Sequence, residues 1–256
     1  MTEPNVPPFG APTREFVRYE ELRVGGQLTG ILEPYMDLCD ELTDIAGPLI
    51  DLLETASNEP GALHARSAIL ARLISDGSAA ARLVRSGYAP QAVTLVATML
   101  ELFHIGAYIG KDDTRGTAYF GWNNPEMAYP GISLRRVINQ VAEREGLERE
   151  SATREYEQVY RTLCLVKHGN PTALYHTSMA NVGETTFIVI GPLESEEYFE
   201  TARLAMFWTV RYELLALLSY VRDVVDQELR RGIAERLAAI ADQHQALGSP
   251  RSHRSE

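Results

Sequence analysis

The segment from Ser195 to about Asp226 restricts the fold more than any other part of this 256-residue chain. It begins with two acidic residues, Glu196 and Glu197, as is typical of a helix N-terminus, where negative charge is favoured. The apolar positions that follow lie nearly all round the helix: Phe199, Met206, Phe207, Trp208, Val210, Leu214, Leu215, Leu217, Leu218, Val221 and Val224. A helix without a clear polar face needs neighbours on every side, so we expect it at the centre of a bundle.

The remaining helices are indicated by apolar residues at three- and four-residue steps. We expect them at about 27–53 (bent or interrupted at Pro34 and Pro48), 62–85, 89–109, 132–145, 151–168 and 228–247. The helix at 228–247 could be continuous with the central helix. Residues 14–27 contain Gly25-Gly26 and are expected to form a short helix or an irregular lead-in. Residues 111–131 are expected to form a long loop.

The apolar period changes to two after Pro171. Residues 173–180 and 185–190 alternate and flank the turn at 181–184, a pattern that predicts a small β-hairpin. Two strands cannot stand alone, so the hairpin must pack against helices. The predicted fold class is therefore all-α: a bundle of about six or seven helices with one small β-hairpin inserted before the long C-terminal helix.

No internal repeat or linker divides the chain. We expect a single helical-bundle domain at 14–247, preceded by a flexible N-terminal arm at 1–13 and followed by a disordered tail at 248–256. The formal net charge of −11 argues against a broad electrostatic grip on nucleic acid, which needs clustered Lys and Arg. A local site that handles one phosphate is compatible with this charge.

Other features of the sequence indicate a cytoplasmic protein without a membrane segment. Its two cysteines, Cys39 and Cys164, have no CxxC partner and are expected to be free thiols in a reducing compartment. The N-terminus has neither the basic start nor the apolar run of a signal peptide. The longest strongly apolar stretches, 92–100 and 214–218, are shorter than a membrane span.

Arg161 and His168 form the first candidate site. Seven residues is close to two helical turns, so both side chains project from one face, with Cys164 between them and Arg154 one heptad earlier. A guanidinium binds phosphate through paired donors, and an imidazole moves a proton near neutral pH, so the pair could perform phosphoryl chemistry without a metal. The structural alternative is that Arg161 pairs with a buried acid and that His168 caps the helix C-terminus.

The segment 160–168, YRTLCLVKH, resembles the Arg, four-to-six residues, His motif of HEPN domains. A wider similarity covers roughly residues 65–225. It links the chain to a bacterial branch of uncharacterised HEPN-like helical proteins, in which a stretch like 83–101 precedes a Tyr-x-x-x-[Ser/Cys]-x-x-x-His element, here Tyr160, Cys164 and His168. The chain departs from the family pattern at Thr162, where active members often carry Asn, Asp or His, and at Ala97, where the related branch commonly has Arg.

The resemblance implies a function. Active HEPN proteins are metal-independent endoribonucleases that work as homodimers, often as toxins or in antiphage defence. Carried over, Arg161 would hold the scissile phosphate and His168 would assist attack by the ribose 2′-OH. The implied partners are a second copy of the chain, an RNA substrate, and an antitoxin or another protein; no cofactor is implied.

Glu101 and His104 form a second constellation, in an apolar helix. A carboxylate there needs a partner or a raised pKa, and we expect Arg161 or His168 to provide the partner. Glu-x-x-His is also a ligand spacing of di-iron bundles, which need a second such pair that this sequence lacks. Asn170 is followed by Pro171, a pair that is typical of a turn, so a turn is a better interpretation of Asn170 than a ligand.

Three hypotheses follow from the sequence. The preferred one is a HEPN-like metal-independent endoribonuclease with Arg161 and His168 at a homodimer interface. The second is a non-catalytic helical interaction module in which Arg161 is structural. The third is a small-ligand or metal-binding bundle that uses Glu101, His104 and His168.

Overall fold

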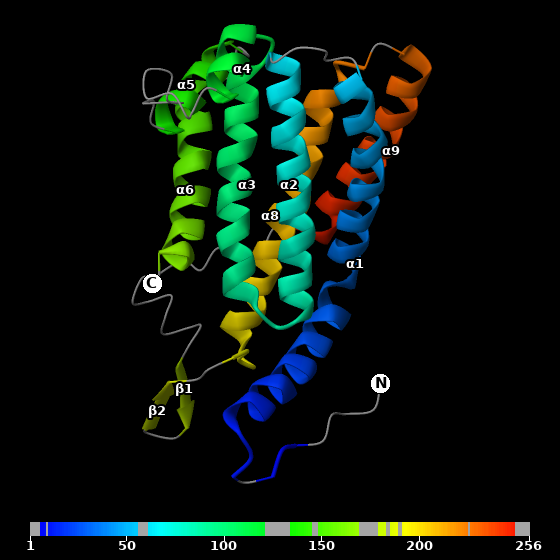
Figure 1. Cartoon of the computed structure of the whole chain (residues 1–256). Helices are drawn as coiled ribbons and strands as arrows, with labels where there is room; N and C mark the ends of the chain where they lie inside the picture. The colour runs from blue at the N-terminus through cyan, green and yellow to red at the C-terminus, as the bar shows by residue number, and fades with distance from the viewer. Residues whose placement is uncertain are drawn as a thin grey trace.

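The computed structural model describes residues 6–8, 10–55, 61–120, 134–144, 148–168, 179–182, 185–188, 191–224 and 226–248. These residues form eight helices: α1 (Thr13–Thr55), α2 (Ala62–Arg85), α3 (Ala89–Ile109), α4 (Asp113–Phe120), α5 (Leu134–Arg144), α6 (Arg149–Lys167), α8 (Glu196–Val221) and α9 (Gln227–Leu247). The all-helical bundle that the apolar periodicity predicted is thus present, and Figure 1 shows its long helices standing side by side.

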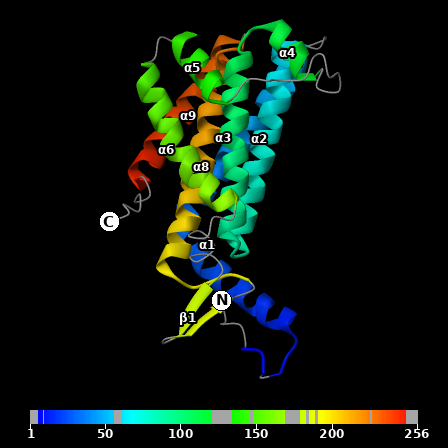
Figure 2. The same ribbon diagram turned by 90° about the vertical axis from the view of Figure 1, so that its left-hand side faces the viewer.

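Helices α3 and α8 lie at the centre of the bundle. Helix α3 packs against α2, α8, α6 and α5, and α8 packs against α1, α2, α3 and α9. Figure 1 shows α6 and α5 on the side of α3 that faces away from α1, and Figure 2 shows the bundle from that side. The C-terminal ends of α3 and α8 lie at the same end of the bundle, and α5 crosses near that end (Figure 1). This arrangement places α6 at the periphery, with one face inward and one outward.

The predicted fold class needs correction. We expected six or seven helices and a hairpin packed into the bundle, whereas the described chain builds its bundle from eight helices alone. Two four-residue strands, β1 (Met179–Val182) and β2 (Thr185–Ile188), pair with each other outside that bundle (Figure 1). The first strand lies at 179–182 instead of 173–180, and residues 173–178 fall outside the described chain. Strands this short bury too little surface to form a layer of the fold.

Helix α1 is longer than predicted. It continues through the expected lead-in at 14–27 and past both internal prolines, Pro34 and Pro48. Figure 1 shows that it changes direction along its length. Gly25 marks a close helix crossing: a Cβ at this position would overlap with the carbonyl oxygen of Arg85 and lie 3.2 Å from the amide nitrogen of Gly87. The glycine therefore serves packing between α1 and the end of α2, and it does not break the helix.

Helix α4 lies within the stretch that we predicted to be a loop. Its start is capped, because the Asp112 side chain accepts a hydrogen bond from the Arg115 amide at 3.1 Å. The neighbouring Asp113 carboxylate accepts from the Ala62 amide at 2.9 Å and so ties α4 to the N-terminus of α2. The Asp-Asp pair was a helix-start signal that the loop prediction missed.

The ends of the other helices follow their capping residues. Ser195 caps α8 by accepting from the Tyr198 amide at 3.1 Å, as its position before the acidic turn indicated. Asp226 caps α9 by accepting from two amides, so α9 is a separate helix. Helix α6 begins at Arg149, two residues before the predicted start at residue 151.

Helices α3 and α8 are long and apolar enough, by length and composition, to cross a membrane. This differs from our prediction that no apolar stretch reaches that length. The core helices of a bundle meet the same criterion, and half or more of each apolar window is buried inside the protein. Their apolar character follows from their central position.

Candidate functional site

The outward face of α6 carries the predicted catalytic pair. Arg154, Arg161 and His168 are all exposed, and their seven-residue spacing places them along one side of the helix. His168 is the C-terminal capping residue, and its amide donates to the Cys164 carbonyl at 3.0 Å. Leu163 faces inward and is fully buried. Arg161 and His168 therefore lie on one exposed face near the C-terminal end of a peripheral helix.

Glu101 does not pair with Arg161 or His168, contrary to our expectation. Its Oε1 accepts hydrogen bonds from Tyr160 Oη and Lys167 Nζ, each at 3.2 Å. Tyr160 and Lys167 are themselves seven residues apart and form the stripe that faces α3. Each residue of the expected pair is the next one along the chain, so it projects about 100° further round the helix. The prediction chose the wrong one of two adjacent stripes.

Arg161 has no ion pair with any other residue that the structure describes. Its i−4 neighbour on the helix, Glu157, pairs instead with Arg135 of α5 at 3.4 Å. Glu101, the other acid proposed for it, is held by Lys167. The structural role that we considered for Arg161 is therefore not supplied by either nearby acid.

Tyr160, Cys164 and His104 lie around Glu101 on the inner side of α6. Tyr156 and Tyr160 stack with ring centroids 5.0 Å apart, and the Tyr156 ring lies 6.1 Å from His104. A hydrogen bond with Cys164, followed by burial, raises the pKa of Tyr160, and burial raises the pKa of Tyr156 to about 12. Both phenols therefore stay protonated at neutral pH, which lets Tyr160 donate to Glu101.

The remaining predicted site features are a metal site, His104 and Asn170. Within the described chain, no group of three His, Cys, Asp or Glu residues lies close enough together to hold a metal ion. His104 Nδ1 lies 2.8 Å from the Leu100 carbonyl oxygen, one turn earlier in α3. Asn170 lies outside the described residues.

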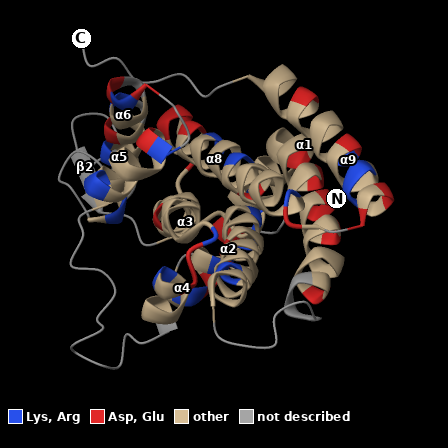
Figure 3. Cartoon of the chain, turned by 90° about the horizontal axis from the view of Figure 1, so that it is seen from above, with Lys and Arg blue, Asp and Glu red and all other residues tan. Residues whose placement is uncertain are grey.

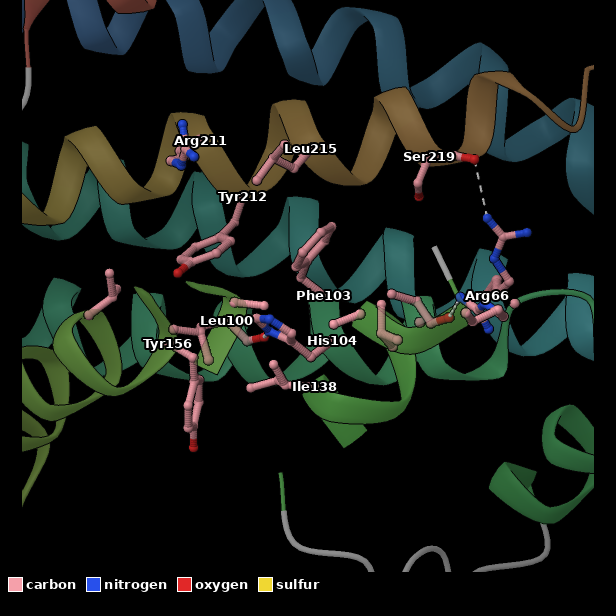
Figure 4. Close-up of a pocket in the computed structure, with 18 of the residues that line it drawn as sticks. Arg66, Leu100, Phe103, His104, Ile138, Tyr156, Arg211, Tyr212, Leu215 and Ser219 are labelled. Carbon is pink, nitrogen blue, oxygen red and sulfur yellow. Dashed lines mark hydrogen bonds between the residues drawn. The ribbon is translucent and has the colours of Figure 1, made fainter. Parts of the chain in front are cut away.

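A cavity of about 950 Å³ lies between α3, α5, α6 and α8, and sequence reasoning did not predict it. Figure 4 shows Phe103, His104 and Ile138 on one side of it and Tyr212 and Leu215 on the other. It is lined by Arg66, Leu100, Phe103, His104, Gly106, Ala107, Gly110, Lys111, Ile138, Val141, Ala142, Arg144, Ala152, Tyr156, Val159, Trp208, Arg211, Tyr212, Leu215, Ser219, Arg222 and Asp223. Neither Arg161 nor His168 lines it, so α6 presents different residues to the cavity and to the outside.

One end of the cavity is built around a buried ion pair. The Arg66 guanidinium contacts Asp223, with only 8% and 11% of the two side chains exposed. Arg66 also donates to the Ser219 carbonyl at 3.3 Å and lies 4.3 Å from the centre of the Tyr220 ring. Its buried Nε has no hydrogen-bond partner among the described residues. Lys111 Nζ approaches Asp223 from the solvent side at 3.4 Å.

The same end contains the C-terminus of α3. This helix has no basic residue in its last turn, so its terminal carbonyls need cations from elsewhere. Arg115 of α4 donates to the Tyr108 carbonyl at 2.7 Å, and Arg144 of α5 donates to the carbonyls of Tyr108 and Ala107. Helices α4 and α5 are therefore anchored at this end through their arginines.

The sequence contained one signal for the cavity. Trp208, Arg211, Leu215, Ser219 and Arg222 recur at three- and four-residue steps on α8, so two arginines lie on a stripe of an otherwise apolar helix. Figure 3 shows, from above, acidic residues along α1 and Lys and Arg on α4 and α5. Five basic side chains line the cavity: Arg66, Lys111, Arg144, Arg211 and Arg222.

No model of a known protein family, no curated protein and no solved structure matches this chain.

Proposed function

We propose that this protein is a HEPN-like endoribonuclease that cleaves RNA without a metal and acts as a homodimer through the outward face of α6. The observation that supports this most is that Arg161 and His168 share an exposed face while the nearby acids are held by Lys167 and Arg135. Exposed and without an acidic partner among the described residues, Arg161 is available to bind a phosphate.

The spacing on α6 favours a two-fold arrangement. If two copies of α6 pack antiparallel with the axis midway between residues 161 and 168, Arg161 of one subunit lies opposite the partner subunit's His168. Leu165 then lies next to the axis, and it is one of the exposed large hydrophobic residues, at 42%. An exposed leucine between two exposed polar residues suits the centre of an interface. Each composite site would be incomplete without the second subunit.

The chemistry follows from the residue types. Arg161 would bind two oxygens of the scissile phosphate and stabilise the charge that develops on them. His168 would take the proton from the ribose 2′-OH, whose oxygen attacks phosphorus and displaces the 5′ oxygen. The products are a 2′,3′-cyclic phosphate and a 5′-hydroxyl, and the second subunit's protonated imidazole would supply the proton that the leaving oxygen takes.

The net charge of −11 limits how such a protein holds RNA. Because acidic residues outnumber Lys and Arg by 35 to 24, RNA would be gripped locally at the α6 face, or with the help of a basic protein partner. A toxin-type role in the cytoplasm, held in check by an antitoxin or a similar partner, is consistent with that arrangement.

The test is cleavage of a mixed RNA pool by the full chain in the presence of EDTA. We expect cyclic-phosphate ends, and loss of at least about a hundredfold in rate for Arg161→Ala and His168→Ala. Arg230→Ala on the exposed part of α9 is the matched control and should cleave normally. Unchanged cleavage in both site variants would overturn the proposal.

Oligomeric state provides a second readout. We expect Leu165→Glu to convert the dimer to a monomer in light scattering and to abolish cleavage, because each site would lose half of its residues. A dimer that Leu165→Glu disrupts, with no cleavage by the unaltered protein, would favour the interaction module instead. A metal at one equivalent per chain in elemental analysis would favour the metal-binding alternative.

A further inference from the structure

We propose that the cavity between α3, α5, α6 and α8 binds an elongated amphiphile with one anionic head group and an aliphatic tail. The volume of about 950 Å³ lies at the upper end of the roughly 300–1,000 Å³ typical of small-molecule sites. The lining residues of α8 extend from Trp208 to Arg222, which is roughly 21 Å at about 1.5 Å per residue. The cavity is therefore long enough for an extended chain.

The middle of the cavity is largely apolar. Its walls come from four helices and include Leu100 and Phe103 of α3, Ile138 of α5, Val159 of α6 and Leu215 of α8, with His104, Tyr156 and Tyr212 as the polar side chains among them. Such walls provide contact area with few hydrogen-bond partners. A nucleobase would leave most of its polar edge unpaired there, which is costly, whereas an alkyl chain has no polar atoms to satisfy. This is why we assign an aliphatic tail.

The charge of the lining indicates an anion. Five lining side chains are basic and one is acidic, in a chain whose net charge is −11. Four of the cations (Arg66, Lys111, Arg144 and Arg222) lie with Asp223 near the C-terminal ends of α3 and α8. The single carboxylate neutralises one of them, so this end keeps an excess of positive charge. An anionic head group placed there would be favoured over a neutral or cationic one.

The orientation follows from the positions of the cations. Figure 4 shows Arg66 and Arg211 at opposite ends of the view. The Arg211 guanidinium lies 5.7 Å from the centre of the Trp208 ring, so this arginine is held against the aromatic wall. The head group therefore belongs at the end with four cations, beside the buried Arg66, whose Nε has no hydrogen-bond partner in the described part of the chain. The tail runs between α3 and α8 toward Trp208.

This site is independent of the proposed nuclease. Ala152, Tyr156 and Val159 line the cavity from the inner side of α6, while Arg161 and His168 lie on its outer face. Binding can therefore be measured whether or not the protein cleaves RNA.

Trp208 provides the assay, since the chain has two tryptophans and Trp122→Phe leaves Trp208 as the single reporter. The probe is a dibrominated stearate, added below its micelle concentration, because bromine quenches indole fluorescence on contact. We expect saturable quenching at about one ligand per chain, reversed by unlabelled palmitate and not by its methyl ester.

Three variants of the Trp122→Phe protein test the assignment. Lys111 and Arg222 are exposed, so the double change Lys111→Glu and Arg222→Glu should leave the fold intact and weaken binding at least about tenfold. The double change Arg230→Glu and Arg231→Glu on α9 alters net charge equally and should have no effect. Ala152→Phe fills part of the apolar region without adding a tryptophan and should block binding of the tail. Non-saturable quenching, equal binding of the methyl ester, equal affinity in the Lys111/Arg222 variant, or displacement by AMP would overturn the proposal.

Discussion

Glu213 and Gly77 provide the sharpest test of the packing described above. Glu213 lies in α8 with none of its surface exposed, and its carboxyl oxygens receive no hydrogen bond from a nitrogen or oxygen donor of the described residues. Burial raises the pKa of the Glu213 carboxyl well above its ordinary value, an effect that the neighbouring Cys39 thiol opposes. We therefore expect a neutral acid in the core at pH 7.

Gly77 lies opposite this carboxyl, inside α2. A Cβ built on Gly77 would overlap with Oε1 of Glu213 and lie 2.8 Å from its Cδ, where ordinary contacts begin at 3.4 Å. A mid-helix glycine costs about 1 kcal/mol relative to alanine, so a packing reason is needed for it. Glu213 provides that reason.

The magnitudes can be worked from these contacts. In the natural protein, Gly77→Ala should gain about 1 kcal/mol of helix propensity and lose about 2–3 kcal/mol to overpacking, for a net destabilisation of about 1–2 kcal/mol. In a Glu213→Ala background the overlap is removed, and the same change should stabilise by about 1 kcal/mol. The sign of the effect therefore reverses, with a coupling of about 2–3 kcal/mol.

The assay is urea unfolding of the four proteins of this cycle, followed by circular dichroism at pH 7. Gly77→Ala in a Glu213→Gln background is the control, because glutamine keeps the shape of the neutral acid and cannot ionise, so destabilisation should persist. If Gly77→Ala changes the free energy of unfolding equally in the natural and Glu213→Ala proteins, the two residues do not share space as described. Stabilisation in the glutamine background would show that the side chain's shape is not what requires the glycine, and would contradict the overlap described here.

Three further predictions concern buried polar groups. Because the pKa of Glu213 is raised, the folded protein holds a proton that the unfolded chain releases above pH 4.5, so the free energy of unfolding should fall as pH rises from 4.5 to 7. Unfolding measured across this pH range should lose that slope in Glu213→Gln. An unchanged slope in the variant would contradict the prediction. His244 of α9 is buried, stacks on Phe207 at 4.5 Å and donates to its carbonyl at 3.1 Å, and burial lowers its pKa. The stability that His244 contributes should therefore be lost as pH falls below 6.5, by at most about 1.4 kcal/mol per pH unit. The difference in free energy of unfolding between the natural protein and His244→Gln should shrink over the same pH range. Arg66→Ala should lower the free energy of unfolding by about 3 kcal/mol in chemical denaturation, because it leaves the largely buried Asp223 with only the exposed Lys111 as an ion-pair partner. A loss under about 1 kcal/mol would mean that the ion pair contributes little to stability.

Local signals identified most of the secondary structure. The apolar steps located α2, α3 and α5 to within a few residues, and Ser195 marked the start of α8. The errors arose where a local signal was weighed wrongly. Gly25 was taken as a helix breaker although it serves a close helix contact, and the cap at Asp112 that starts α4 was overlooked.

The candidate site was predictable only in part. The heptad spacing identified Arg161 and His168 as neighbours on one face of a helix, because that geometry depends on the helix alone. Which face of α6 meets α3 depends on how α6 is rotated about its own axis. A rotation of about 100°, equivalent to one residue, directs Tyr160 and Lys167 toward Glu101 in place of Arg161 and His168. Tyr160 and Lys167 satisfied the same spacing, so the sequence could not decide between the two stripes.

The sequence by itself determined that the chain forms a helical bundle with an apolar central helix, since helical periodicity and the absence of a polar face are properties of one segment at a time. Only the tertiary structure decided that Glu101 pairs with Lys167, that Glu213 is buried against Gly77, and that four helices enclose a cavity with a basic end. Each of these depends on the relative rotation and spacing of helices distant in sequence. An empty volume has no residue of its own, so no sequence pattern records it directly.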